Sequence, residues 1–511
     1  MPETLFELLS HHPDDAPALG GLDRPWMSHG ALRNLAEATR ARLNAFGIGS
    51  GDRVAIVLPN GPEMAAAFAA IGCTAVTCPL NPAYREEEYD FYLGDLSAKA
   101  LVVEAGYDGP ALASAQKLGV GVIRLRGDRA KPAGWFELDG DESLAEARET
   151  GYAGPDDIAL ILHTSGTTSR PKIVPLLHRN LSASAGNIGA TLRLGPEDRC
   201  LNIMPLFHIH GLIAAVTSSL AAGGSIWCAP GFNALQFFGW LDLAKPTWFT
   251  AVPTMHQAIL SRAERNQEVL ARSGLRFIRS SSASLPPQVM TALEETIGAP
   301  VIESYGMTEA CHQMTSNPLP PLPRHAGSVG VEAGPLVRIA SESEGRILDA
   351  GATGEVVISG PNVTPGYEAN PAANDSAFFE AEGRRWFRTG DQGAIDAEGY
   401  LRLTGRLKEI INRGGEKVSP LEVDEVLMDH PAVQQVVTFA IPHDKLGEEV
   451  AAAVVPREGQ SIDEGGLRDF AAARLAGFKV PRKVVILDEI PKGATGKLQR
   501  IGLAEKLGLV P

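Results

Sequence analysis

The chain has 511 residues, and its 46 basic and 61 acidic residues give a formal net charge of -15. This length predicts one large domain and at least one more, with an apolar core that needs no disulfide bonds. The acidic excess argues against nucleic acid or an anionic membrane as a partner, because both carry negative charge themselves.

The cysteines and the chain start indicate a compartment. Five cysteines without a Cys-x-x-Cys pair favour a reducing environment over a disulfide framework. The acidic start has no basic segment followed by an apolar core, as a secretory signal requires, and no apolar run reaches the roughly 18 residues of a membrane helix. We therefore expect a cytoplasmic protein without membrane insertion. The sequence leaves open whether it is a monomer or a homodimer.

The first part of the chain alternates strand-like and helix-like segments. Residues 54–58 form a continuous apolar run, which is typical of a strand buried on both faces. Pro62 then opens an alanine-rich segment, as expected in the first turn of a helix, and residues 74–80 are strand-like again. This βαβ order predicts parallel or mixed sheets that are covered by helices.

The order of predicted helices and strands changes after about residue 403. Ser419-Pro420-Leu421-Glu422 is a capping box, so a helix should begin there. Two strand-like runs, a helix and a closing strand follow, at residues 433–441, 450–455, 465–476 and 483–487. We therefore expect an α/β fold class with a large N-terminal domain, residues 1–405, and a small α+β domain, residues 406–511.

The segment from Thr164 to Lys172 carries the most specific chemical signal. It holds five hydroxyl side chains, a glycine and two cations, and such a loop can cradle a polyphosphate that Lys172 would neutralise. It is not a Walker A loop, because no glycine precedes the lysine. Ser169-x-x-Lys172 also fits the nucleophilic serine of penicillin-recognising enzymes, and a polar surface loop is a third interpretation.

This segment resembles the phosphate-binding loop of the adenylate-forming superfamily, which includes acyl-CoA synthetases, nonribosomal peptide adenylation domains and luciferases. Four further blocks resemble that superfamily in the same order along nearly the whole chain: an adenylate block at 303–309, a ribose block at 386–391, a hinge at 405–409 and a catalytic lysine block at 491–497. The resemblance implies an ATP-dependent, AMP-forming acid–thiol ligase that uses ATP, CoA and Mg²⁺. A small carboxylic acid would become an acyl-adenylate and then a thioester.

The resemblance also implies roles that suit each side chain. Asp391 would accept hydrogen bonds from the ribose hydroxyls, with help from Arg406, and Tyr305 would offer a face to adenine. Glu309 would bind Mg²⁺, and Lys497 would stabilise charge on the α-phosphate. The catalytic set implied is Lys497, Thr308, Glu309 and His208. The ATP-binding set implied is Thr164, Ser165, Gly166, Thr167, Thr168, Lys172, Ser284, Glu303, Tyr305, Gly306, Thr308, Asp391, Arg406 and Lys497.

The same resemblance makes Lys408 the pivot of a mobile C-terminal domain. It also places Gly414, Gly415 and Lys417 at the CoA, because glycines allow close approach and cations can meet phosphates. Two alternatives stay open at this point. The acceptor could be the thiol of a carrier protein, or the chain could bind adenylates without catalysis, although the intact set of Lys497, Glu309 and Asp391 argues against the latter.

Two histidines stand at Phe207-His208-Ile209-His210. On a strand both would point to one face, as zinc ligands do, but no nearby cysteine or carboxylate completes a site. The resemblance places His208 at a gate between the acyl pocket and the CoA tunnel, whereas His210 is expected only to be packed.

Within the superfamily, the chain resembles the oxalate–CoA ligase branch. The shared features are Ser169 in the loop, Arg279-Ser-x-Ser-Ala-Ser-Leu285, His312 after residues 308–311, Ser316-Asn317-Pro318 and residues 412–417. The acyl pocket implied consists of His208, Ser281, Ser282 and His312, whose polar groups suit the second carboxylate of a very small acid. Medium-chain, long-chain or aromatic acids remain the alternative.

One residue departs from this pattern. Ile173 stands where glycine is usual, and a β-branched residue does not easily take a positive φ. Either the loop differs there, or the glycine serves only packing.

Overall fold

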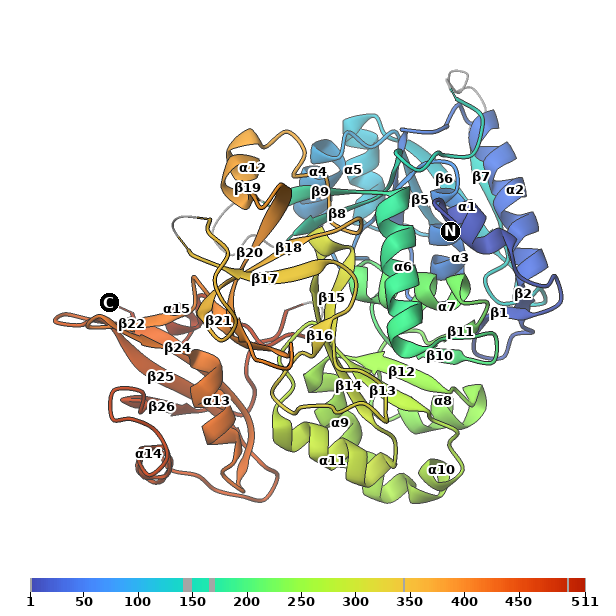
Figure 1. Ribbon diagram of the computed structural model, residues 1–511. Coiled ribbons are helices and arrows are strands. Elements are labelled where there is room, and N and C mark those ends of the chain that lie inside the picture. Colours follow the sequence, from blue (N-terminus) through green and yellow to red (C-terminus); the bar gives the residue numbers. More distant parts are fainter. Residues whose placement is uncertain (1, 141–148, 165–170, 343–344, 494–495, 511) are drawn as a thin grey trace.

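The structure is a computed structural model that describes residues 2–140, 149–164, 171–342, 345–493 and 496–510. Within these ranges the strands form four sheets, with helices packed on and between them (Figure 1). Three sheets lie in the chain up to Arg406, and the fourth contains the C-terminal part. The predicted α/β fold class, with a large N-terminal and a smaller C-terminal part, is confirmed.

The first sheet has seven strands in the order β7-β6-β5-β3-β4-β8-β9. The central strand β3 pairs in parallel with β4 and β5, whereas the edge strands β7 and β9 pair antiparallel. Pro62 begins the helix between β3 and β4, as predicted. The strands are β3 (Arg53–Val57), β4 (Val76–Pro79), β5 (Ala100–Glu104), β6 (Gly121–Gly127), β7 (Phe136–Gly140), β8 (Ile158–Thr164) and β9 (Lys172–Leu177).

The second sheet has nine strands in the order β16-β15-β14-β13-β12-β10-β11-β1-β2. Its six central strands are parallel, and β2, β15 and β16 add antiparallel edges. The strands are β1 (Pro17–Gly20), β2 (Met27–Ser28), β10 (Arg199–Asn202), β11 (Ser225–Cys228), β12 (Trp248–Ala251), β13 (Phe277–Ser280), β14 (Val301–Met307), β15 (His312–Ser316) and β16 (Val331–Glu332).

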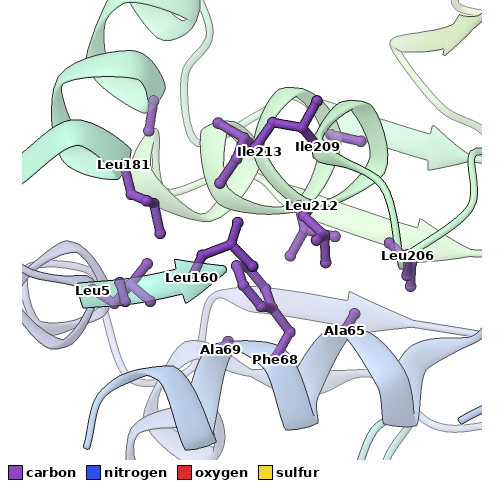
Figure 2. Close-up of a cluster of buried hydrophobic side chains, with 14 of the residues drawn as sticks. Leu5, Ala65, Phe68, Ala69, Leu160, Leu181, Leu206, Ile209, Leu212 and Ile213 are labelled. Carbon is purple, nitrogen blue, oxygen red and sulfur yellow. The ribbon is translucent and has the colours of Figure 1, made fainter. Parts of the chain in front are cut away.

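Helices fill the space between these two sheets and cover their outer faces. Figure 2 shows Phe68 of α3 pointing towards Leu160 of β8 and Leu212 of η1, and all three side chains are buried. The helices are α1 (Leu5–Ser10), α2 (His29–Ala45), α3 (Pro62–Gly72), α4 (Glu86–Asp95), α5 (Pro110–Leu118), α6 (His178–Leu192), the π-helix η1 (His210–Thr217), α7 (Ser218–Ala221), α8 (Phe237–Ala244), α9 (Pro253–Ala263), η2 (Glu264–Asn266), α10 (Gln267–Ala271), α11 (Pro287–Ile297), η3 (Thr308–Ala310) and α12 (Pro371–Ala377).

The third and fourth sheets follow one another along the chain. The third contains β17 (Leu336–Ala340), β18 (Thr353–Ser359), β19 (Phe378–Ala381), β20 (Arg384–Ile395) and β21 (Leu401–Arg406). The fourth contains β22 (Ile411–Arg413), β23 (Glu416–Val418), β24 (Val433–His443), β25 (Gly447–Pro456) and β26 (Lys483–Ile486), with helices α13 (Pro420–Met428), α14 (Glu464–Ala472) and α15 (Leu503–Lys506). The predicted cap is confirmed: the Ser419 side chain accepts a hydrogen bond from the backbone N–H of Glu422. The domain boundary at residues 405 and 406 stays a prediction.

The two histidines of the segment 207–210 do not lie on a strand, the arrangement that would have turned both to one face. His210 begins the π-helix η1, and His208 precedes it in the connection from β10. The apolar residues that follow are buried on all sides in that helix, which the short segment around the histidines does not reveal. In the described part of the chain, no helix combines the length and apolarity that crossing a membrane would require.

Candidate active site

The predicted phosphate loop connects two antiparallel strands of the first sheet. Thr164 at the end of β8 pairs with Lys172 at the start of β9, so the strands close the loop at its base. The Nζ atom of Lys172 lies 4.3 Å from the ring centroid of Tyr367. Four residues expected to bind ATP, Ser165, Gly166, Thr167 and Thr168, lie outside the described residues, as does Ser169.

Ile173 shows what the departure from glycine means. It lies in β9, pairs with His163 and packs with apolar side chains of the first sheet. Its carbonyl accepts the backbone N–H of Glu368. An extended strand residue needs no positive φ, so an isoleucine fits here without strain. The structure therefore supports the explanation that the usual glycine serves only packing, and not the explanation that the loop has a different backbone at this position.

Glu309 is held by a tyrosine that the sequence analysis did not include. The hydroxyl of Tyr367 donates to Oε1 of Glu309 at 2.8 Å, and the backbone N–H of Thr364 donates to the Glu309 carbonyl at 2.7 Å. Burial raises the pKa of the Glu309 carboxyl. Thr308 is half-buried at the start of the same short helix η3. The carboxylate of Glu309 therefore lies close to Lys172, at the base of the phosphate loop.

A second carboxylate is held by the residues predicted to contact the nucleoside. The hydroxyl of Tyr305 donates to Oδ2 of Asp391 at 2.5 Å, and Nε of Arg406 lies 3.4 Å from Oδ1. Asp391 and Arg406 face each other on β20 and β21. Burial raises the pKa of Asp391, although Arg406 opposes that shift. The structure thus joins three predicted residues, with the hydroxyl of Tyr305 positioning the aspartate.

Lys497 reaches this group from the C-terminal part of the chain. The hydroxyl of Thr254 on α9 donates to the carbonyl of Gly496 at 2.7 Å, which fixes the segment before the lysine. Burial, followed by the positive charge of Arg406, lowers the pKa of Lys497 to about 8, whereas Asp391 opposes the shift. Lys497 also lines a cavity of about 140 Å³ between α9 and the C-terminal sheet, together with Ser284, Asp424 and Arg500.

Two residues predicted to contact ATP have clear packing roles. Oε1 of Glu303 accepts the backbone N–H of Leu285 at 2.8 Å, which holds the loop that contains Ser284, and burial raises the Glu303 pKa to about 8. A Cβ atom at Gly306 would lie 1.5 Å from the carbonyl oxygen of His312. Glycine is therefore required at position 306 for β14 to pair with β15.

Three of the four residues predicted for the acyl pocket, His208, Ser282 and His312, lie around His210. Nδ1 of His210 lies 3.0 Å from the Ser282 hydroxyl, and the rings of His210 and His312 are 4.9 Å apart between centroids. Nδ1 of His208 accepts the backbone N–H of His210 at 3.3 Å. His210, expected only to be packed, is thus at the centre of the group. Ser281 differs, because its buried hydroxyl donates to the carbonyl of Ser304.

The histidines of this site are neutral. Burial, with the charge of Lys497 as a second cause, lowers the pKa of His208 to about 3. Burial also lowers the pKa of His210 and of His312 well below the usual range, and Arg279 contributes to both shifts. Each ring therefore has one donor and one acceptor nitrogen.

Backbone strain sets the directions of two of these side chains. Ser282 and His312 have φ angles of +75° and +92°, which residues other than glycine rarely adopt. Cys311, which precedes His312, has a φ angle of +49°, and its carbonyl accepts the Ser184 hydroxyl at 2.5 Å. Such strain persists only where surrounding contacts fix it, and it concentrates at functional sites.

The comparisons with known proteins agree with this geometry. Residues 5–368 match the model of the AMP-binding enzyme family, and residues 422–497 match that of the AMP-binding enzyme C-terminal domain. The chain belongs to the AMP-binding enzyme family. The resemblance drawn from the five motif blocks is thereby confirmed.

Individual relatives match over most of their length. An oxalate–CoA ligase of Arabidopsis thaliana is 46% identical over 504 residues, which are 97% of this chain and 96% of the relative. An oxalate–CoA ligase of Saccharomyces cerevisiae is 42% identical over 478 residues, which are 89% of this chain and 86% of the relative. The crystal structure of ATP-bound MatB from Rhodopseudomonas palustris matches with a TM-score of 0.88 at 31% identity and covers 99% of both chains.

In this AMP-binding enzyme, the residues predicted at the CoA lie apart from the others. Gly414 and Gly415, with φ angles of +61° and +96°, make the turn between β22 and β23, and Lys417 is exposed on β23. Figure 1 shows β22 at the outer end of the C-terminal sheet, away from β14 and β20. Lys408 is exposed in the turn between β21 and β22. The structure thus brings Lys497 to the site but not the hairpin.

Proposed function

We propose that this enzyme is an ATP-dependent, AMP-forming carboxylate–CoA ligase whose preferred substrate is oxalate or another very small acid. The observation that carries the proposal is the position of Lys497 beside Asp391 and Arg406, next to a compact site of neutral histidines. The two oxalate–CoA ligases that match nearly the whole chain support the same reaction class.

In the first half-reaction, an oxygen of the substrate carboxylate attacks the α-phosphorus of ATP, and the bond to pyrophosphate breaks. The cation of Lys497 would contact the carboxylate and the α-phosphate and stabilise the charge that builds on phosphorus. Asp391 would hold the ribose, and Lys172 with the loop that starts at Thr164 would hold the departing phosphates. Glu309 suits a magnesium ion, which takes one or two carboxylates plus phosphates; when bound, it would neutralise phosphate charge.

In the second half-reaction, the CoA sulfur attacks the acyl carbon, and AMP leaves with the bonding electrons of the anhydride. The hairpin with Gly414 and Gly415 would have to approach the site, and Lys497 would leave it. We propose that residues 406–511 rotate as a domain against residues 1–405, with the backbone at Lys408 as the pivot. Hinges of this kind absorb large φ and ψ changes at a few residues.

The proposed acid follows from the polarity and burial of the acyl site. Nδ1 of His208 and Nδ1 of His312 act as acceptors, so the Nε2–H groups of these two rings are donors towards the acyl site. Both ring nitrogens of His210 are already hydrogen-bonded, to Ser282 and Thr250. An apolar chain would leave those donors unpaired, which costs about 1–3 kcal/mol per group. The five cysteines are free and buried, which suits the cytoplasmic location that we propose.

The test is CoA-dependent AMP formation from oxalate, malonate, acetate, octanoate and 4-coumarate, compared by kcat/KM. We expect oxalate to rank first and free oxalyl-CoA to appear in equal amount to AMP. A higher kcat/KM for octanoate or 4-coumarate would refute the polar acyl site. Pyrophosphate release without free acyl-CoA would instead point to a carrier protein as the acceptor.

A further inference from the structure

Arg279 is a buried cation without a counter-charge. It lies on β13, and its side chain has no solvent exposure. Its Nη2 atom donates to Oε1 of Gln313 at 3.1 Å and faces Nδ1 of His312 at 3.5 Å, whereas Nε and Nη1 have no hydrogen-bond partner. Within the described part of the chain, no carboxylate forms an ion pair with Arg279 or shifts its pKa.

This situation is energetically costly. Arginine is almost never fully buried unless it is paired, because removing its charge from water costs several kcal/mol. Even partly buried arginines of this chain are paired: Arg388 with Glu355, and Arg53 with Glu368. Burial lowers the pKa of Arg279 only to about 9, so the group is charged at neutral pH. The described residues therefore do not supply the negative charge that would balance this guanidinium.

The neighbours of Arg279 indicate where that charge would come from. A guanidinium has only donors, so Nδ1 of His312 must accept, and the proton of the neutral ring is at Nε2. The ring of His312 lies beside His210, which contacts Ser282. Arg279 thus stands directly behind the acyl site. Its charge acts strongly there because the surroundings exclude water.

We propose that Arg279 is a specificity-determining positioning residue: it holds His312 with its Nε2 proton available to the substrate, and its uncompensated charge selects an acid that carries a second carboxylate. This inference rests on the proposed function and names the class of acid that the site prefers. The second carboxylate would accept the Nε2 proton of His312 in a hydrogen bond and would neutralise the field of Arg279. A monoacid would leave that charge unmatched.

The experiment compares oxalate with oxamate, in which an uncharged amide replaces one carboxylate at nearly the same size. Truncating one partner of a buried charge pair costs about 2–5 kcal/mol, which corresponds to roughly thirtyfold or more. We expect Arg279→Gln to lower the oxalate-to-oxamate ratio of kcat/KM at least about thirtyfold, through KM for oxalate, with KM for ATP unchanged. Arg279→Lys, which keeps the charge, should restore most of that ratio.

Matched variants separate this role from folding. Arg199→Gln removes a partly buried guanidinium of strand β10 that contacts the Trp26 ring, and it should keep the wild-type ratio. Arg279→Met serves if the glutamine variant does not fold, because an apolar side chain of similar length removes an unpaired charge. Equal losses with oxalate and oxamate in the Arg279 variants would overturn the proposal, since that result would show packing alone.

The two proposals fail in different ways. If the wild-type enzyme forms no AMP from any small acid with CoA, the proposed function is wrong. Calorimetric titration of oxalate and oxamate into the wild-type protein and Arg279→Gln, with AMP present, still tests Arg279 in that case. Preferential oxalate binding that disappears in the variant supports the inference, and equal affinity for both ligands in the wild-type protein overturns it.

Discussion

The lowered pKa of Lys497 predicts an alkaline limit for the adenylation half-reaction. Lysine contributes to the transition state only as a cation, and its pKa in the free enzyme is about 8. The charged fraction is then about 90% at pH 7 and about 10% at pH 9. The kcat/KM for ATP in pyrophosphate release should therefore fall about tenfold between these pH values, because this parameter reports groups of the free enzyme.

Two controls identify the group responsible. Lys497→Arg keeps a charge that does not titrate below pH 12, so its residual adenylation should not decline between pH 7 and 9. Glu303, whose burial raises its pKa to about 8, titrates in the same window, and only the arginine variant separates it from Lys497. Thioester formation from supplied oxalyl-adenylate should not decline in this range. A flat wild-type profile, or the same decline in Lys497→Arg, would refute the assignment.

Three further predictions concern single residues. Lys408→Pro fixes φ at the proposed pivot, so pyrophosphate release should persist while oxalyl-CoA formation collapses; unchanged overall turnover would place the pivot elsewhere. His312→Ala removes a buried donor and should raise KM for oxalate about tenfold or more while sparing KM for ATP, and an equal effect on both substrates would contradict this. Gly306→Ala places a Cβ atom 1.5 Å from the His312 carbonyl and should lower the free energy of unfolding in urea by about 1–3 kcal/mol or more, whereas wild-type stability would show that the strands can shift.

The sequence predicted the features that depend on neighbours along the chain. Apolar runs and the proline at position 62 indicated β3, α3 and β4, and the capping box located the start of α13. The motif blocks identified the family because each contains several residues in a fixed spacing. Such signals are local, so they can be recognised before the fold is known.

Only the tertiary structure decided which of these residues meet. The hydroxyl of Tyr367 reaches Glu309 from 58 positions away, and no pattern near either residue indicates the pair. Arg279 on β13 faces His312 on β15 from 33 positions away, and only the fold shows that its guanidinium is buried without a carboxylate partner among the described residues. Pairing between distant segments and the exclusion of water are properties of the packed chain. For this reason the sequence determined the family and its blocks, while the structure decided the partners, the protonation states and the strain of the acyl site.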